Sequence, residues 1–334
     1  MSQSGKRPAP AKYKTFKIIR LCILAATTAA AMLFMRFCGA KPAADSPLDA
    51  LRDSLETIAS AQPGEIGIAL ITCSGDTLTV NNEDRYPLMS VFKLHQALAL
   101  CRDMERRGAS PDTLLAIPRT RLNPDTWSPM LKEREGDTIK VTVRDLMRYA
   151  LVQSDNNASN LLFEDFLGVG ETDRYIATLI PRDGFRLTVS EAQMWDDHSL
   201  CYENHTSPLA AARLIYRLFT ENDFGGRDGG FIRGALAECK TGNDRIAAPL
   251  EGVAGASIAH KTGSGFRTAE GVLTAHNDVA FVTLPDGDSY ALAVFVKDFR
   301  GDEKAAAKVI SEISRVVYES LEGSELLSAV NQKM

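Results

Sequence analysis

The chain has 334 residues, of which 45% are hydrophobic, and a formal net charge of −5 at pH 7. This length and apolar content predict about two folded domains and exclude a disordered chain. Residues 1–40 hold seven Lys or Arg and no acid, so the rest of the chain carries −12, and this balance does not favour nucleic acid as a partner.

The first predicted element is an export signal over residues 1–40. Its basic head leads into an uncharged run at residues 21–35, and small residues follow as far as Ala40. The run is short for a membrane span, so we expect cleavage near Ala40, with an uncleaved anchor as the alternative. Lipidation at Cys38 is a second alternative, although bulky or charged residues precede this cysteine. We therefore expect a periplasmic protein that meets the membrane only if the leader is uncleaved.

Export favours an oxidising compartment, in which cysteines form disulfides. Four cysteines follow the leader and allow three pairings: Cys73, Cys101, Cys201 and Cys239. Burial as free thiols is the alternative. No CxxC motif or Cys/His spacing indicates a metal site, and we expect neither a metal nor a cofactor.

Strand patterns occupy both ends of the remaining chain. Ser46-Pro47 begins a capped amphipathic helix, and Ser74-Gly75-Asp76 is a turn between two strands. After Gly252 three strands and a closing amphipathic helix are expected, with Pro285-Asp286-Gly287 as the turn between the last two strands. The expected strands cover residues 65–73, 77–80, 257–261, 272–284 and 290–296, and the closing helix covers residues 303–321.

Between these ends, from about Ser90 to Phe219, apolar residues recur mostly at helical spacing. The fold class is therefore α/β, with a five-stranded antiparallel sheet flanked by the N- and C-terminal helices and an inserted all-α domain. We expect residues 41–86 and 240–334 to form a discontinuous α/β domain and residues 87–239 an all-helical domain. The active cleft is expected at their boundary.

In the segment PLMSVFKLH, residues 87–95, a hydroxyl and an amine lie three residues apart in an apolar run. If a helix begins near Ser90, Lys93 lies on the same face one turn later and its amine reaches the serine oxygen. Serine is a poor nucleophile until a base takes its proton, and lysine serves as that base only when its pKa is lowered. A helix cap with a surface lysine gives the same spacing, so this motif alone decides nothing.

Two further motifs are equally ambiguous when taken alone. Ser154-Asp155-Asn156 offers a hydroxyl that could relay a proton and an amide that could bind a carbonyl, but a polar turn between helices has the same composition. Lys261-Thr262-Gly263, together with Ser264, offers a cation and two hydroxyls to an anion, and the glycine would let a ligand approach the backbone. A sheet edge protected by a lysine is the alternative here.

Together and in this order, S-x-x-K, S-D-N and K-T-G form the motif set of class A β-lactamases and penicillin-binding proteins. The chain resembles this superfamily over nearly all of residues 46–322. It is most similar to a divergent class A subgroup of cephalosporinases and extended-spectrum enzymes, on three segments: residues 260–263 (HKTG), 276–278 (HND) and 293–298 (AVFVKD). The resemblance implies that the chain hydrolyses the β-lactam amide bond through a serine acyl-enzyme, with cephalosporins as the expected substrates and antibiotic resistance as the outcome.

The resemblance also implies a role for each motif residue. Ser90 attacks the lactam carbonyl, Lys93 helps to take its proton, and backbone N–H groups of Ser90 and Ser264 form the oxyanion hole. Ser154 passes a proton to the lactam nitrogen, with electrostatic support from Lys261. The implied binding residues are Asn156 for the side-chain amide of the substrate, and Thr262, Gly263 and Ser264 for its carboxylate.

Removal of the acyl group needs a base for water, and the resemblance implies Glu191, which lies 37 residues after Ser154. A solvated loop carboxylate is the alternative. The family pattern is incomplete here. Trp195 stands where an asparagine usually helps to hold the water, and Val189 and Asn204 replace the pair that usually forms a salt bridge in this loop. How the chain holds the deacylating water is therefore open.

Three more positions follow from the resemblance. Arg245 matches an arginine that reaches toward the substrate carboxylate in some members, with an exposed ion pair as the alternative. Trp127 matches an aromatic residue at the mouth of the cleft, and a half-buried surface tryptophan is the alternative. Because Met89 and not cysteine precedes Ser90, the disulfide found beside the nucleophile in class A carbapenemases cannot form.

These motifs predict a monomeric serine β-lactamase with a small-molecule β-lactam as its partner. A penicillin-binding D,D-peptidase is the alternative if Glu191 does not lie over the acyl group. A sensor domain that is acylated without turnover, and held by an uncleaved leader, is the second alternative.

Overall fold

The computed structural model describes residues 47–83 and 85–322. The predicted export signal and the lipidation alternative at Cys38 lie outside these residues. No helix within the described ranges combines the length and the apolar character needed to cross a membrane.

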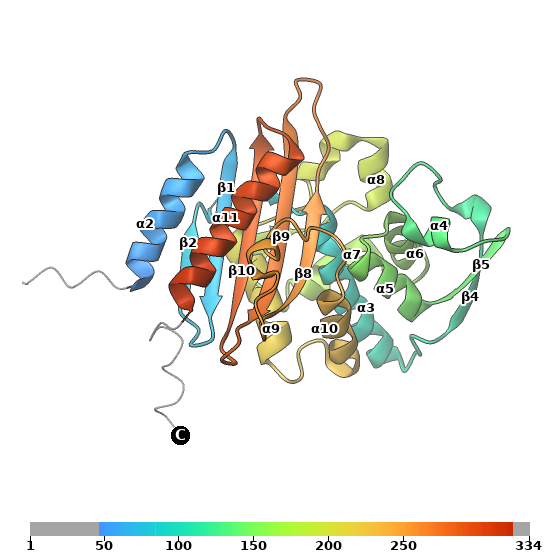
Figure 1. Cartoon of the computed structure of the whole chain (residues 1–334). Helices are drawn as coiled ribbons and strands as arrows, with labels where there is room; N and C mark the ends of the chain where they lie inside the picture. Colours follow the sequence, from blue (N-terminus) through green and yellow to red (C-terminus); the bar gives the residue numbers. More distant parts are fainter. Residues whose placement is uncertain (1–46, 84, 323–334) are drawn as a thin grey trace, which may run out of the picture. The chain divides into compact units, whose positions relative to one another are not determined.

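A five-stranded antiparallel sheet has the strand order β2-β1-β10-β9-β8 (Figure 1). The strands are β1 (Glu65–Thr72), β2 (Thr77–Val80), β8 (Ser257–Ser264), β9 (Leu273–Thr283) and β10 (Ser289–Phe299). Gly75 and Gly287 lie in the two predicted turns, and both have the positive φ that glycine adopts without strain. The predicted α/β fold with its five-stranded antiparallel sheet is confirmed.

Both faces of this sheet are covered, so β9 and β10 are buried along most of their length. Helices α2 (Pro47–Ser60) and α11 (Glu303–Leu321) pack on one face (Figure 1). Their apolar stripes contribute Leu55 and Ile313 to a core that also contains Leu292 of β10. These are the two flanking helices that the sequence predicted.

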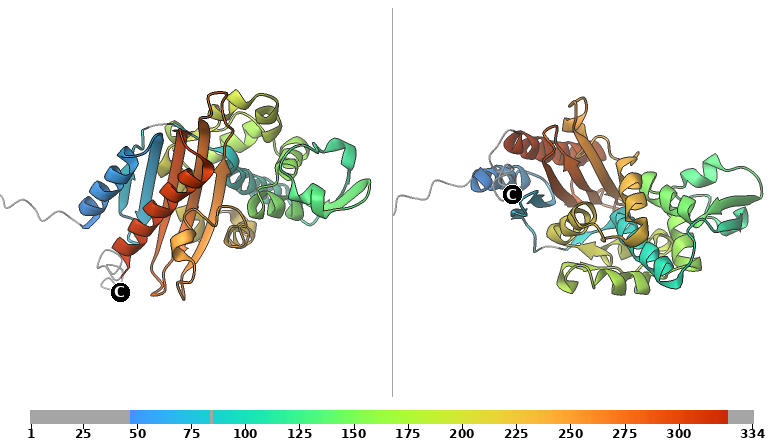
Figure 2. Two further views of the ribbon diagram at one scale, coloured as in Figure 1. Left: turned by 45° about the horizontal axis from the view of Figure 1, so that its top comes forward. Right: turned by 90° about the horizontal axis from the view of Figure 1, so that it is seen from below.

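The other face of the sheet packs against helices from the middle of the chain, which lie on the side opposite to α2 and α11 (Figure 2). Leu98, Leu214 and Phe295 belong to the core on this side. Helices α9 (Pro208–Thr220) and α10 (Gly229–Ala237) contact the strands directly. The other helices of the middle segment are α3 (Phe92–Arg107), α4 (Pro129–Glu133), α5 (Val143–Val152), α6 (Asn156–Asp165), α7 (Val169–Ile176) and α8 (Glu191–Asp196). Short 3-10 turns are η1 (Met89–Val91), η2 (Arg119–Arg121), η3 (Arg182–Gly184), η4 (His198–Tyr202), η5 (Gly226–Asp228) and η6 (Ala248–Leu250).

The middle segment also carries short strands that the helical periodicity did not predict. β4 (Leu114–Pro118) pairs with β5 (Thr138–Thr142), and β7 (His205–Thr206) lies between β3 (Tyr86–Pro87) and β6 (Phe185–Arg186). Strands of two residues are too short to give a periodic signal, and those of five residues lie among helices whose spacing dominated the prediction for this segment. The division into domains at residues 86–87 and 239–240 stays a prediction.

Among the described residues, the alternative of burial as free thiols holds for Cys101 and Cys201, and Cys239 is also a free thiol. Cys101 and Cys201 are buried, and Cys73 and Cys239 are partly exposed.

Candidate active site

Ser90 lies in a strained turn that leads into α3. Met89, just before it, has a φ of 45°, in the left-handed region that non-glycine residues rarely adopt. The turn is held by the sheet, because the side-chain amide of Asn277 on β9 donates to the Pro87 carbonyl at 2.7 Å. Strain that persists under such support is typical of a functional site.

Lys93 lies one turn after Ser90, and its Nζ donates to Ser90 Oγ at 2.9 Å. The side chain is fully buried. Nζ also donates to the Ser154 carbonyl at 2.8 Å and to Asn156 Oδ1 at 2.6 Å, and it lies 2.8 Å from Glu191 Oε1. All four partners can accept a hydrogen, so this is a buried, paired ammonium and not the surface lysine of a helix cap.

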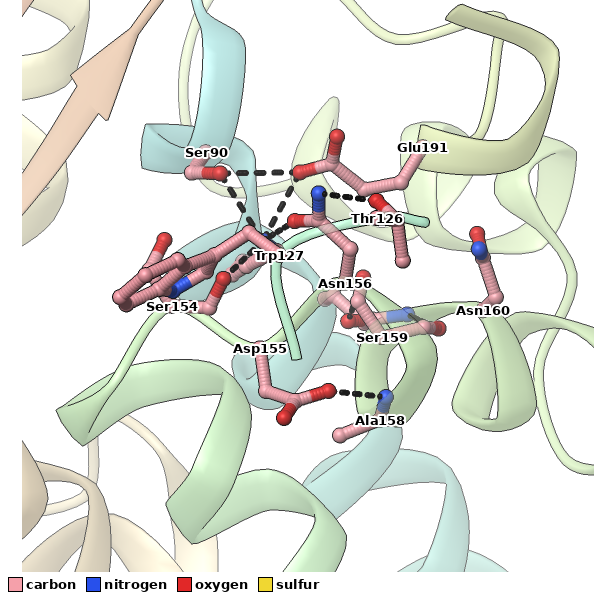
Figure 3. Close-up of polar contacts among 12 residues, drawn as sticks. Ser90, Thr126, Trp127, Ser154, Asp155, Asn156, Ala158, Ser159, Asn160 and Glu191 are labelled. Carbon is pink, nitrogen blue, oxygen red and sulfur yellow. Dashed lines mark hydrogen bonds and ion pairs between the residues drawn. The ribbon is translucent and has the colours of Figure 1, made fainter. Parts of the chain in front are cut away.

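Glu191 is the first residue of α8, and its carboxylate points toward Ser90 (Figure 3). Oε1 accepts a hydrogen bond from Ser90 Oγ at 2.9 Å, and the side chain is 6% exposed. Ser190 and Gln193 form a capping box at the start of this helix. The Ala192 N–H donates to Asn160 Oδ1 at 3.0 Å. These contacts place the carboxylate beside the serine, so the solvated-carboxylate alternative does not hold.

Ser154 connects the two buried lysines. Its φ is 57°, its carbonyl accepts from Lys93, and its Oγ accepts from Lys261 Nζ at 3.0 Å. Lys261 is fully buried and also donates to the Thr262 carbonyl at 2.9 Å. Burial lowers the pKa of Lys261 to about 7, although Cys239 opposes this shift. Lys261 therefore changes its charge close to neutral pH.

A second titratable group, the imidazole of His260, lies next to Lys261 on β8. His260 Nδ1 is 3.1 Å from Asp278 Oδ1. Burial opposes a charge on His260, but Asp278 and Cys239 together raise its pKa to about 10. Burial also opposes ionisation of Cys239, but His260 and Lys261 lower the pKa of its thiol to about 7. The thiol of Cys239 therefore contributes to the field at Lys261.

Thr262, Ser264 and Arg245 form the other wall of the site. The Arg245 guanidinium donates to Ser264 Oγ at 2.7 Å and to the carbonyls of Gly263 and Asn277 at 3.1 and 2.6 Å. Arg245 is only 6% exposed, burial lowers its pKa, and no ion pair among residues 47–83 and 85–322 includes it. The exposed ion pair is therefore wrong for Arg245. A buried cation without a carboxylate favours an anionic ligand.

Gly263 was expected to let a ligand approach the backbone, but it serves the packing of β8 on η1 instead. A Cβ atom at this position would lie 2.7 Å from the Leu88 carbonyl oxygen and 3.0 Å from Met89 Cβ. The space beside the glycine is thus filled by the turn that carries the nucleophile, and no ligand approaches there. The absence of a side chain allows β8 to pack directly against η1.

One cavity of about 350 Å³ unites most of the predicted site residues. Its lining includes Ser90, Trp127, Ser154, Asn156, Glu191, Arg245, Thr262 and Ser264. Lys93 and Lys261 are fully buried beside it. Trp127 is 53% exposed, and its indole N–H donates to the Gln153 carbonyl at 2.8 Å. No group of three His, Cys, Asp or Glu side chains in the described part of the chain is arranged to hold a metal ion.

The sequence reasoning missed three contributors to this site. Thr241 and Phe266 also line the cavity, and Asn160 holds the start of α8. A local sequence pattern could have indicated two of these residues, Phe266 and Asn160. Phe266 continues the alternation of Thr262 and Ser264, and Asn160 lies one helical turn after Asn156. Thr241 had no such pattern, because its contact with Thr262 joins distant segments at 2.5 Å between the two hydroxyls.

Asn204 replaces the expected salt bridge of the loop by neutral hydrogen bonds. Its Oδ1 accepts from the N–H groups of Thr188 and Val189 at 2.8 and 3.0 Å, and its Nδ2 donates to the Val189 carbonyl at 2.8 Å. Trp195, at the position where an asparagine was expected, lines the cavity with its indole. The loop is therefore held without a buried ion pair at this point.

Comparison with known proteins agrees with this geometry. The model of the β-lactamase enzyme family matches residues 50–321. A β-lactamase of Phocaeicola vulgatus is 55% identical over 282 residues, which cover 84% of this chain and 88% of the relative. The chain belongs to the β-lactamase enzyme family. The extended-spectrum β-lactamase PER-1 of Pseudomonas aeruginosa is 29% identical, over 90% of this chain and 96% of the relative.

Solved structures assign this β-lactamase to class A. The crystal structure of a class A β-lactamase from Bacteroides cellulosilyticus superposes with a TM-score of 0.77 at 28% identity, covering 83% of this chain and 99% of that structure. The extended-spectrum β-lactamase TLA-3 gives a TM-score of 0.78 at 27% identity, covering 82% and 99%. The chain is thus an enzyme, a class A serine β-lactamase that hydrolyses the β-lactam amide bond.

Proposed function

We propose that this β-lactamase opens the lactam ring with Ser90, releases the acyl group with water activated by Glu191, and prefers cephalosporins. The main support is the position of Ser90 Oγ, which lies 2.9 Å from both Lys93 Nζ and Glu191 Oε1 at the cavity. A nucleophile needs a base within hydrogen-bond reach, and a carboxylate at 2.9 Å meets this need.

In the acylation step, Glu191 accepts the proton of Ser90 as Ser90 Oγ bonds to the lactam carbonyl carbon. The hydrogen bonds favour Glu191 over Lys93 for this role, because Ser90 Oγ donates to Glu191 Oε1 and accepts from Lys93 Nζ. Lys93 then acts through its charge, which stabilises the serine oxygen as it loses its proton. This differs from the role expected from the Ser90-to-Lys93 spacing.

Collapse of the tetrahedral intermediate requires a proton on the lactam nitrogen. Ser154 Oγ accepts a hydrogen bond from Lys261, which leaves its own hydrogen available for this transfer. The negative oxygen of the intermediate is stabilised by the backbone N–H groups of Ser90 and Ser264. The proton that Glu191 took from Ser90 then replaces the one lost by Ser154, so Glu191 is again a carboxylate and Ser154 again a hydroxyl. In deacylation, Glu191 takes a proton from the water that attacks the ester carbonyl and passes it to Ser90 Oγ as the ester bond breaks.

Substrate binding uses the other wall of the cavity. Thr262, Ser264 and Arg245 receive the carboxylate of the substrate, which supplies the anion that this wall lacks. Asn156 donates one amide hydrogen to Thr126 Oγ1 at 2.9 Å and accepts from Lys93. Its second amide hydrogen is left for the side-chain carbonyl of the substrate. The similarity to extended-spectrum relatives supports cephalosporins as the preferred class.

We also propose that the protein acts in the periplasm as a monomer, after cleavage of its leader. The basic head and apolar run of residues 1–40 support export. Mass spectrometry of the protein recovered from the periplasm tests this directly, because cleavage near Ala40 removes both the leader and Cys38. A membrane-bound protein of full length would contradict it.

Turnover of a chromogenic cephalosporin by the exported protein tests the hydrolytic function. Many turnovers per enzyme are expected, and a single stoichiometric burst would contradict it. Because Glu191 is the proposed base of both steps, Glu191→Gln should be acylated more slowly than the wild type and should then retain the acyl group, visible as an added mass on the intact protein. Glu203→Gln is the matched control, because Glu203 is an exposed acid of the same loop. Full turnover by Glu191→Gln would show that another group is the base.

A further inference from the structure

The segment that carries Glu191 has few polar anchors where it faces the strand wall, the side of the cavity formed by Thr262, Ser264 and Arg245. Apart from the contact of Glu191 with Lys93, no ion pair of the described chain involves residues 188–204. The Ala192 N–H is bonded to Asn160 of α6, and Tyr202 is bonded through its hydroxyl to Asp298 of β10. Among the described residues, no hydrogen bond or ion pair joins residues 192–200 to β8 or β9, and the next residue, Cys201, hydrogen-bonds through its thiol to Thr274 of β9.

Residues 192–200 are joined to the strand wall by an aromatic contact. The rings of His198 and Phe266 are nearly parallel, at 10°, with centroids 3.7 Å apart. Trp195, which lines the cavity, places its ring edge-on to His198 at 6.3 Å. The rings thus run from α8, through His198 at the start of η4, to the residue two positions beyond Ser264. We call the His198–Phe266 pair the aromatic clasp.

The strand side of the clasp is firmly held. The Phe266 N–H donates to Thr274 Oγ1 at 3.0 Å, and the Thr274 N–H donates to the Phe266 carbonyl at 2.9 Å. Phe266 is therefore fixed to the start of β9 from both sides. The segment with His198 is the part whose position the stack can determine.

Acylation changes how Glu191 is held. In the free enzyme its Oε1 accepts from Ser90 Oγ and contacts Lys93 Nζ. Once Ser90 is esterified, its oxygen has no hydrogen to donate, so one of these two contacts is lost. Water must then be held by Glu191 with the apolar face of Trp195 nearby, where the sequence pattern led us to expect an asparagine. The position of α8 therefore depends more on its other contacts during deacylation than during acylation.

We propose that His198 and Phe266 are positioning residues for deacylation, because their stack holds the segment that carries Glu191 over the acyl group. This inference rests on the proposed role of Glu191. A misplaced base loses rate steeply with distance, whereas acylation starts from a carboxylate that is already bonded to Ser90. Loss of one aromatic pair should slow deacylation by about two- to tenfold.

The test measures acylation and deacylation separately, by stopped-flow absorbance with a chromogenic cephalosporin and by intact mass of the quenched enzyme. His198→Ala and Phe266→Ala should each slow deacylation by about two- to tenfold, leave acylation within about twofold, and raise the acylated fraction. His198→Phe retains the stack and should restore deacylation. The double variant should be no slower than the worse single variant, because both remove the same contact.

A matched control separates positioning from a general loss of packing. Phe219 of α9 stacks on Phe281 of β9, with centroids 4.6 Å apart at 9°, and neither residue lines the cavity. Phe219→Ala removes a similar pair and should leave both rate constants unchanged.

Several outcomes would overturn the clasp alone while wild-type turnover continues. They are equal losses in both steps, no loss in either step, or a His198→Phe variant as slow as His198→Ala. A wild-type enzyme that is acylated once and never released would overturn the proposed function, and the clasp with it.

Discussion

The cavity has a helical wall, on the side of Lys93 and Glu191, and a strand wall, on the side of Lys261. Both lysines are fully buried, but among the described residues only Lys93 has a carboxylate within ion-pair distance. Lys261 instead donates to the hydroxyl of Ser154 and to the carbonyl of Thr262. Its neighbour Arg245 also has no carboxylate partner there. The helical wall is electrostatically complete in the free enzyme, whereas the strand wall holds cations that an anion would complement.

This difference separates chemistry from binding. The pair of Lys93 and Glu191 can exchange a proton with Ser90 without a change in the net charge of that wall. The strand wall gains most when a carboxylate arrives, because an unpaired buried cation is unfavourable. We therefore expect substitutions on the helical wall to affect stability and the chemical steps, and those on the strand wall to affect mainly substrate affinity.

The largest effect is expected from Lys93→Met, which keeps the side-chain volume and removes the charge. kcat/KM should fall by about 10²–10⁴-fold, since the serine oxygen loses its stabilising cation. The variant should also lose about 3–5 kcal/mol of unfolding free energy, because Glu191 remains as an unpaired buried carboxylate. Urea unfolding and steady-state kinetics measure the two losses.

Lys93→Met/Glu191→Gln provides the control for this assignment. The double variant should regain stability over Lys93→Met and remain inactive, because the neutral amide leaves no buried charge. A double variant less stable than Lys93→Met would show that the ion pair is not the cause.

Lys261→Met should reduce activity less than Lys93→Met, and it should change KM more than the free energy of unfolding. Loss of the buried cation behind the carboxylate-binding Thr262, taken as worth about 1.5–3 kcal/mol, should raise KM for a carboxylate-bearing β-lactam by about 10–100-fold, and kcat should also fall because Ser154 loses its hydrogen bond from Lys261. The stability loss should be well below that of Lys93→Met, since no carboxylate is left unpaired. A stability loss as large as that of Lys93→Met, with KM unchanged, would contradict the distinction between the two walls.

The pH dependence of kcat/KM should reflect the charge of Lys261. The pKa of Lys261 is lowered by burial to about 7, so the residue loses its positive charge as pH rises through this value. kcat/KM, which reflects the free enzyme, should therefore fall above about pH 7, whereas kcat should stay level to higher pH because a bound carboxylate favours the charged amine. Profiles from about pH 5.5 to 9.5 test this.

Lys261→Arg should remove this alkaline limb, because a guanidinium stays charged throughout the range. If the limb persists unchanged in Lys261→Arg, another group causes it.

The smallest effect is expected from Trp127→Ala at the mouth of the cavity. The side chain is 53% exposed, with Lys132 Nζ 5.2 Å from its ring centre. Removal should raise KM by about two- to fivefold and leave unfolding free energy within about 0.5 kcal/mol. A larger loss of stability would show that Trp127 is a packing residue. Thermal unfolding and initial rates decide between these outcomes.

Local patterns carried much of the prediction. The Ser90-to-Lys93 spacing gave their contact because three residues make one helical turn, and the strands at both ends gave the sheet because their alternation and turns are local. Other features needed contacts between distant segments. The pairing of Thr241 with Thr262, the burial of Arg245 and the packing of Gly263 on Met89 have no local signature.

The sequence by itself determined the fold class and the order of the three motifs, since helix spacing, strand alternation and turn residues act over a few positions. Only the tertiary structure decided the charge distribution of the site. Burial and partners set it, because the same lysine side chain is paired with Glu191 at position 93 and lacks a carboxylate at position 261. The hydrogen bonds that Asn204 makes across its loop, and the stack of His198 on Phe266, likewise depend on contacts between residues that are not neighbours in the chain.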